Sequence, residues 1–120
     1  MFPASMLAQL YVKGSLKNTA SGFEFKLKNV IDSGTLVGLG PLGVDETSYT
    51  PDAVTLRIGE RVMHGDEISH STPLPVRSYS EIFLSVDGAP LTSGGHKLTI
   101  QIVTREVGRL QFSVNETISE

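Results

Sequence analysis

The sequence predicts an all-β fold, namely a single antiparallel β-sandwich, or a partly closed barrel, over residues 1–120. Three observations support this prediction. Apolar and polar residues alternate with a period of two over several segments, turn-forming residues separate these segments, and no long window places apolar residues at helical spacing. The spacing of the turns corresponds to about seven to nine strands in two packed sheets.

The alternating segments follow one another along the chain. In the clearest of them, Phe23, Phe25 and Leu27 alternate with charged residues. Successive side chains of a strand point to opposite faces, so each such segment is expected to bury one face and expose the other. Leu7 and Tyr11 suggest an earlier strand that leads into this one. The other expected strands are a short apolar run at 35–37 and the stretches 54–58, 61–63, 82–86, 97–102 and 109–114.

Turn-forming residues lie between these stretches. Residues 59–60 predict a tight hairpin, and Gly108 predicts a second hairpin between the last two strands. Residues 87–88 read Asp-Gly, which is typical of a type I′ turn after a strand. Residues 66–69 are the best candidate for a helix, and they predict a single helical turn.

A glycine-rich tract over residues 34–43 has the spacing of a dinucleotide-binding fingerprint at Gly38, Gly40 and Gly43. That fingerprint requires a strand before it and a helix after it. Here Pro41 interrupts the tract and no helical pattern follows. The tract is therefore interpreted as a connection between the two sheets.

Composition excludes several classes of protein. The chain has 120 residues, a net charge of −3, no cysteine and no tryptophan. The missing cysteines exclude a disulfide scaffold, a thiolate zinc site and a cysteine nucleophile. The mild acidity argues against a nucleic-acid partner, because phosphate binding needs a basic surface. No run of about 20 apolar residues is present, so no membrane association is expected, and a cytoplasmic location is predicted.

Two histidines flank a short acidic segment. His64 and His70 enclose Asp66 and Glu67, and imidazole together with carboxylate can bind a metal or carry out acid–base chemistry. Their spacing matches no standard set of metal ligands. A solvated loop is the alternative reading, so these histidines are candidates for ligand or partner contact only, and no metal site is predicted.

The third histidine opens a predicted strand. His96 follows Gly94 and Gly95, and paired glycines allow positive φ and a close backbone approach. These three residues are candidates for a contact with a ligand or partner at a loop tip. The alternative is a turn in which His96 packs locally. No catalytic residue is assigned anywhere in the chain.

The order of several short motifs resembles that of the small β subunit of bacterial C-glycoside deglycosidases. The resemblance extends over roughly the whole chain. It rests on a "Leu-x-Asn…Gly-Phe" opening and on a "Leu-x-x-Gly-x-His" element before a late strand. The residues that carry it are Leu16, Asn18, Gly22, Phe23, Leu91, Gly94 or Gly95, and His96.

This resemblance implies a β-sandwich accessory subunit of a carbon–carbon lyase in carbohydrate metabolism. In that family a larger, barrel-type α subunit holds a divalent metal and the catalytic base, and the pair cleaves the C–C bond of 3-oxo-C-glycosides. The small subunit supports or covers the active site. The resemblance therefore implies no cofactor in this chain, a divalent metal in a partner α subunit, and docking to that subunit.

Two other functions stay open at this point. The chain can be a free-standing carbohydrate-binding or protein-interaction module without catalysis, or a small autonomous enzyme that uses its histidines. Phe83 and Val103 lie opposite the main aliphatic rows, and the first and last strands are candidate sheet edges. Exposed edges and apolar patches favour pairing with another chain. Self-association is therefore predicted as an alternative or addition to a larger partner.

Overall fold

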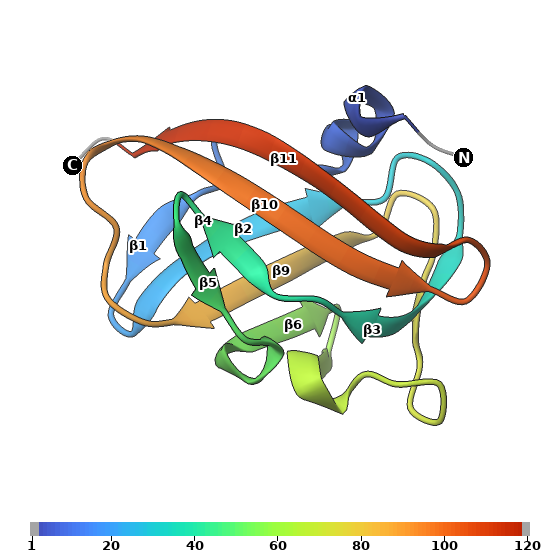
Figure 1. The fold of residues 1–120 in the computed structure, drawn as a ribbon. Coiled ribbons are helices and arrows are strands. Elements are labelled where there is room, and N and C mark those ends of the chain that lie inside the picture. Colours follow the sequence, from blue (N-terminus) through green and yellow to red (C-terminus); the bar gives the residue numbers. More distant parts are fainter. Residues whose placement is uncertain (1–2, 119–120) are drawn as a thin grey trace.

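Two antiparallel sheets pack face to face in the computed structural model, which describes residues 3–118 (Figure 1). The first sheet has the strand order β1-β2-β9-β6-β7, and the second has the order β5-β4-β10-β3-β8, with β11 paired to β10. The first sheet contains β1 (Lys17–Thr19), β2 (Gly22–Lys28), β6 (Val54–Ile58), β7 (Arg61–His64) and β9 (Glu81–Asp87). The second contains β3 (Gly34–Leu39), β4 (Leu42–Val44), β5 (Thr47–Tyr49), β8 (Leu74–Val76), β10 (Gly94–Thr104) and β11 (Gly108–Ile118).

The predicted all-β sandwich is confirmed, and the sheets do not close into a barrel. The structure has eleven strands among the described residues, more than the sequence pattern predicts. The additional strands β1, β4, β5 and β8 have three residues each. Three residues are too short to show a period-two alternation, so these strands are set by pairing with their neighbours.

The alternating segments bury the face that the pattern predicts. On β2, Phe23, Phe25 and Leu27 are buried, and they pair with Val86, Leu84 and Ile82 of β9. The fully buried side chains at the centre come from both sheets: Phe23, Phe25, Val54 and Val86 from the first, and Leu98 and Ile100 from the second. The core is therefore aliphatic with a few phenylalanines between the two sheets.

The longest feature is the β10–β11 hairpin, which we call the long ribbon. Its strands pair without interruption from Gly94 opposite Ile118 to Thr104 opposite Gly108. β10 also pairs with β4 near its start and with β3 near its end. In Figure 1 the long ribbon runs diagonally across the molecule, so its two ends lie at opposite ends of the sandwich.

The glycine tract forms β3 and β4 of one sheet and does not connect the two sheets. Both strands lie against β10, and the glycines let the backbones approach. A Cβ atom on Gly40 would lie 2.7 Å from the Cβ of Gln101, and one on Gly38 would lie 3.3 Å from the Cβ of Val103. These glycines therefore serve strand packing, which corrects the sequence-based interpretation.

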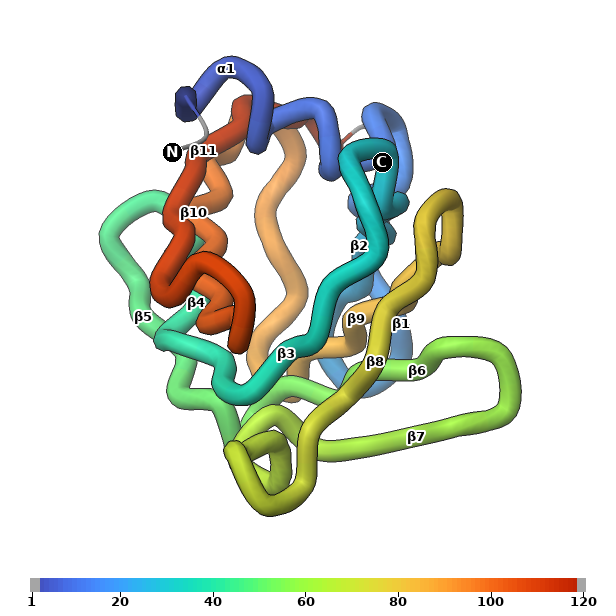
Figure 2. The backbone as a smooth tube through the Cα atoms, turned by 90° about the vertical axis from the view of Figure 1, so that its right-hand side faces the viewer, coloured from blue at the N-terminus to red at the C-terminus, as the bar shows by residue number. Residues whose placement is uncertain are grey.

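The N-terminal strand expected around Leu7 and Tyr11 is also wrong. The chain instead forms α1 (Ala4–Leu7) and a 3-10 turn (Ala8–Leu10), and Tyr11 makes a single bridge to Leu27. Leu7 and Leu10 are three residues apart and both buried, which is helical spacing. Figures 1 and 2 show α1 beside β11, where it covers one end of the space between the sheets.

Of the predicted turns, those at residues 59–60 and at Gly108 are confirmed as hairpins. The helical turn expected at residues 66–69 instead covers Gly65–Glu67, because Ile68 is already extended. The second of the three short 3-10 turns covers Pro51–Ala53. The Asp87-Gly88 pair does not form a hairpin. It begins the segment that crosses from β9 in the first sheet to β10 in the second.

The predicted apolar patch at Phe83 is covered by cations. The Arg57 guanidinium lies 4.2 Å from the centre of the Phe83 ring, and the Lys26 ammonium lies 5.3 Å from it. Self-association stays a prediction. No helix within residues 3–118 is long and apolar enough to cross a membrane.

Candidate functional site

His64 has a local structural role. It lies exposed at the end of β7, and its backbone N–H donates to the Glu67 carboxylate at 2.7 Å. Its Nδ1 lies 3.3 Å from the Thr55 hydroxyl on the adjacent strand. The hydrogen bond between the His64 N–H and the Glu67 carboxylate caps the helical turn that follows β7, so Glu67 is used as a cap.

His70 lies exposed in the loop between that helical turn and β8. The structure does not bring the three histidines together, since His64, His70 and His96 lie on β7, on this loop and on β10. Over residues 3–118, no group of three or more His, Cys, Asp or Glu side chains is arranged to hold a metal ion.

His96 is buried and held at both ring nitrogens. Its Nδ1 lies 2.7 Å from Asp45 Oδ2, and its Nε2 lies 2.7 Å from the backbone oxygen of Thr92. Both partners accept hydrogen bonds, so the geometry fits an imidazolium that donates twice. The Thr92 carbonyl, followed by the Asp45 carboxylate, raises the pKa of His96 above its ordinary value of 6.5, although burial opposes this.

Asp45 connects the β4–β5 turn to β10. It adopts a positive φ of 56°, its backbone N–H donates to the Lys97 oxygen at 2.8 Å, and its Oδ1 accepts from the Lys97 N–H at 2.9 Å. The hydrogen bond from Lys97, followed by that from His96, lowers the pKa of the Asp45 carboxyl. Asp45 and His96 therefore form an ion pair that fixes the turn to the sheet.

A cleft of about 420 Å³, which we call the polar cleft, lies beside the ion pair of Asp45 and His96. Glu116 accepts hydrogen bonds there from the Tyr11 hydroxyl at 2.8 Å, from the Gly14 N–H, and from the Thr117 N–H at 3.1 Å. Burial raises the pKa of Glu116, but these hydrogen bonds and Lys13 outweigh it, and the net pKa is lowered. Burial, followed by the bond to Glu116, raises the pKa of Tyr11. The residues that line the polar cleft are Lys13, Asp45, Gly95, His96, Lys97, Asn115, Glu116 and Thr117.

The predicted residues Gly94 and Gly95 open β10 at this end. Gly94 has a φ of +114°, a conformation that L side chains rarely adopt, whereas Gly95 has no positive φ. Both glycines therefore form the first two residues of β10, and their role is in the backbone of the strand. No buried polar side-chain atom among the described residues lacks a hydrogen-bond partner, so the polar groups of this region satisfy one another.

A second cavity, which the sequence analysis missed, lies between the sheets at the other end of the long ribbon. This apolar pocket has a volume of about 300 Å³. Packed protein interiors contain few voids larger than a water molecule, so a space of this size is a candidate binding site. Its walls are the apolar side chains Leu7, Leu10, Leu27, Ile31, Leu36, Leu39, Leu56, Val76, Ile82, Leu84, Ile102, Val107 and Leu110.

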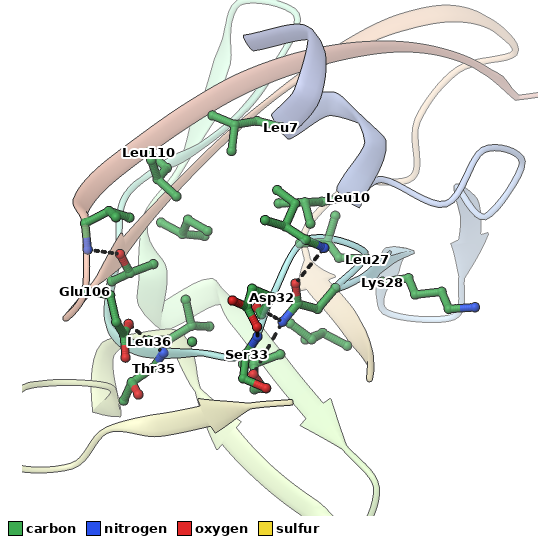
Figure 3. A pocket seen from close by; sticks show the side chains of 18 of the residues that line it. Leu7, Leu10, Leu27, Lys28, Asp32, Ser33, Thr35, Leu36, Glu106 and Leu110 are labelled. Atoms are coloured by element: carbon green, nitrogen blue, oxygen red, sulfur yellow. Dashed lines mark hydrogen bonds between the residues drawn. The ribbon is translucent and has the colours of Figure 1, made fainter. Parts of the chain in front are cut away.

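These walls come from elements far apart in the sequence. Figure 3 shows Leu7 on α1, Leu110 on β11 and Leu10 beyond the helix pointing into the same space. Leu36 on β3 closes the pocket from below in this view. α1 therefore completes the wall that the two sheets leave open.

The polar lining residues gather at one side, which we call the mouth. The Glu106 carboxylate accepts from the Thr35 N–H at 3.0 Å, and the Asp32 carboxylate accepts from the Ser33 N–H at 2.7 Å. The bond from the Thr35 backbone lowers the pKa of Glu106, so this carboxylate is ionised at neutral pH. Lys28 also lines the pocket, but its side chain points away from the centre in Figure 3.

Sequence reasoning missed the pocket because each of its walls reads as an ordinary core residue. The only indication was the helical spacing of Leu7 and Leu10. Asp45 was missed as the partner of His96 because 51 residues separate the two in the sequence.

The motif residues behind the family resemblance have structural roles. The Asn18 side chain makes two hydrogen bonds with the Leu91 backbone, at 2.9 and 2.8 Å. A Cβ atom on Gly22 would lie 1.9 Å from the Val86 oxygen, so only glycine fits there. Leu16 and Phe23 are buried in the core. These motifs therefore describe how a sandwich is built and do not identify a family.

Comparison with known proteins gives a different assignment. The sequence model described as "Hydroxymethylglutaryl-CoA reductase, N-terminal domain" matches residues 6–119. A comparison with curated proteins finds no match. The family match overturns both the resemblance to the C-glycoside deglycosidase β subunit and the lyase function inferred from it, and it gives the free-standing module no better support. Because the match covers nearly the whole sequence, the chain belongs to the hydroxymethylglutaryl-CoA reductase N-terminal domain family.

Proposed function

We propose that this chain is a non-catalytic, ligand-binding domain of a hydroxymethylglutaryl-CoA reductase and that it holds a small apolar molecule between its sheets. The apolar pocket is the observation that carries this proposal. Its volume of about 300 Å³ is at the lower end of the range for small-molecule sites. Such sites are lined mainly by apolar side chains with a few polar groups at one side, which is the arrangement found here.

The polar side chains beside the polar cleft, at the other end of the long ribbon from the apolar pocket, have a structural role. Asp45, His96 and Glu116 each bond to neighbours within the chain, and these bonds join the β4–β5 turn and the N-terminal segment to the long ribbon. Side chains used in this way hold the fold. We therefore propose that chemistry is carried by a larger catalytic polypeptide and that this domain acts through binding.

The reductase substrate is a poor match for the apolar pocket. Hydroxymethylglutaryl-CoA carries a carboxylate and the phosphates of coenzyme A, and burying such charges without partners is costly. The walls of the apolar pocket offer leucine and isoleucine. We therefore propose a ligand other than the substrate, so that binding adjusts the reductase. A cytoplasmic location, a second copy as partner and a metal held by a partner stay predictions.

The test is a titration of the ¹⁵N-labelled chain with decan-1-ol, followed by ¹H–¹⁵N correlation spectra. We expect saturable shifts at residues around the apolar pocket, such as Leu36, Ile82 and Leu110. Leu110→Phe should fill the apolar pocket and weaken binding at least tenfold. Val114→Phe is the matched control, because Val114 lies on the same face of β11 but outside the pocket lining. Absence of binding, or equal losses in both variants, would refute the proposal.

The link to the reductase is tested separately. The chain and the catalytic part of the reductase from the same organism are co-expressed. Sedimentation then shows whether they associate, and a reductase assay with and without decan-1-ol measures the rate of the complex. A stable complex whose reductase rate changes with decan-1-ol is the expected result. A chain that never associates with the catalytic part would remove the reductase half of the proposal and leave the ligand half standing.

A further inference from the structure

The mouth of the apolar pocket carries two fixed carboxylates. Glu106 comes from the turn between β10 and β11, and Asp32 comes from the loop between β2 and β3. Backbone N–H groups of Thr35 and Ser33 hold them in place. The mouth therefore presents negative charge on two sides of the opening.

Positive charge at the mouth is weaker. Lys28 is the only basic residue among those that line the apolar pocket, and its side chain is directed away from the centre (Figure 3). Arg105 attracts its neighbour Glu106 but does not line the apolar pocket. A ligand head group at the mouth therefore meets carboxylates first.

The size of the apolar pocket limits the body of the ligand. A cavity of about 150 Å³ takes up benzene, so a volume of about 300 Å³ has room for roughly ten to twelve carbon atoms. The rim adds further apolar surface. Val107 is 50% exposed, Val30 lies between two lining residues and is 38% exposed, and Tyr79, whose N–H donates to the lining residue Asn29, is 70% exposed.

We propose, on the basis of the proposed function, that the apolar pocket selects an amphiphile with a chain of about ten carbons and a neutral or cationic head, and that it rejects the matching carboxylate. The chain lies among the leucines and the head lies at the mouth. A hydroxyl or ammonium head donates hydrogen bonds to Asp32 and Glu106. A carboxylate head is repelled by both, and repulsion of this kind is a common source of specificity.

The experiment compares decan-1-ol, decylamine and decanoate at neutral pH, each below its aggregation limit, by calorimetry and the same ¹⁵N spectra. Decan-1-ol and decylamine should bind, and decanoate should bind at least tenfold more weakly. In the double variant Asp32→Asn with Glu106→Gln, decanoate binding should strengthen about tenfold, while decan-1-ol binding stays within twofold. The amide oxygens of the new side chains can still accept from the Ser33 and Thr35 N–H groups, so the loops are expected to keep their fold, which urea unfolding checks.

The outcomes separate the two proposals. If decanoate binds wild type as tightly as decan-1-ol does, the selection is refuted and the apolar-ligand site stands. The selection also fails if the double variant leaves the preference unchanged. If none of the three compounds binds, the proposed ligand-binding function itself is refuted.

Discussion

The two ends of the long ribbon contrast in what their side chains contact. At one end His96 contacts Asp45 and the Thr92 carbonyl, and Glu116 accepts bonds from Tyr11 and from two backbone N–H groups. At the other end, leucines and isoleucines line a pocket of about 300 Å³, which reaches Thr104 on β10. Thr104 lies eight residues beyond His96, or about 26 Å along the strand. The polar end holds the residues that look chemical in the sequence, but they bond to one another beside an open polar cleft. The apolar end has a pocket between the sheets whose walls are mainly leucine and isoleucine.

The contrast shows that reactive side chains are a poor guide to function in this molecule. A buried histidine with both nitrogens bonded inside the chain has no capacity left for a substrate. An apolar wall with no neighbour opposite it gains contacts when a ligand enters. The predictions that follow test this difference between polar side chains that bond to one another and apolar side chains that line a pocket.

The largest effect is expected in the filled part of the core. Leu98 is fully buried, so Leu98→Ala should lower the free energy of unfolding by about 3–5 kcal/mol. Leu36 lines the apolar pocket and already borders open space, so Leu36→Ala should cost only about 2 kcal/mol. Urea unfolding followed by circular dichroism measures both. Equal losses would indicate that the apolar pocket is filled in solution by a rearranged core.

The next effect concerns the ion pair. His96→Ala removes two hydrogen bonds of a buried side chain and should cost about 1–3 kcal/mol in the free energy of unfolding. His64→Ala is the control, because His64 is exposed, and it should change the value by less than about 0.5 kcal/mol. Decan-1-ol affinity should be unchanged in both variants. A loss of ligand binding in His96→Ala alone would show that the two ends are coupled.

A smaller loss is expected at the start of β10. Gly94→Ala forces a side chain into a φ of +114° and should cost about 1–2 kcal/mol. Gly95→Ala meets no atom within 4 Å and needs no positive φ, so it should be neutral or slightly stabilising. Urea midpoints of the two variants provide the measurement. If Gly95→Ala destabilises as much as Gly94→Ala, the strain explanation is wrong.

The smallest effect is a pH dependence at the polar end. The pKa of His96 is raised on folding, so its contribution is complete below the ordinary value of 6.5 and is lost as pH rises through the raised value. The pKa of Asp45 is lowered, so its contribution is present above 3.8 and is lost as pH falls through the lowered value. The free energy of unfolding of wild type should therefore decline above pH 6.5.

The control for this pH dependence is His96→Gln, which should lack the decline. His64 and His70 are present in both proteins, so the difference between the two profiles isolates His96. Unfolding in urea at a series of pH values between about 5 and 9 gives these profiles. A wild-type profile parallel to that of the variant would contradict the imidazolium assignment.

Much of the fold could be predicted from the sequence because long strands carry their own pattern. The alternation around Phe23 and Phe25 identified β2, and the later alternating stretches identified β6, β9, β10 and β11. The N-terminal segment was mistaken for a strand because its few apolar residues fit either period. There the contact with β11 stabilises a helix.

The family could not be read from short motifs. Asn18, Gly22 and Leu91 are needed to build the corner of this sandwich, and unrelated sandwiches with the same corner can need the same residue types. Only the comparison along residues 6–119 corrected the assignment.

The sequence by itself determined the all-β class, the faces of the long strands and the absence of cysteine chemistry. These properties depend on residue types and on neighbours one or two positions away. The tertiary structure decided which polar residues meet and where space remains. Asp45 reaches His96 across 51 residues, and the apolar pocket needs α1, both sheets and the end of the long ribbon together. A cavity is a property of packing among distant segments, so no local pattern of residues announces it.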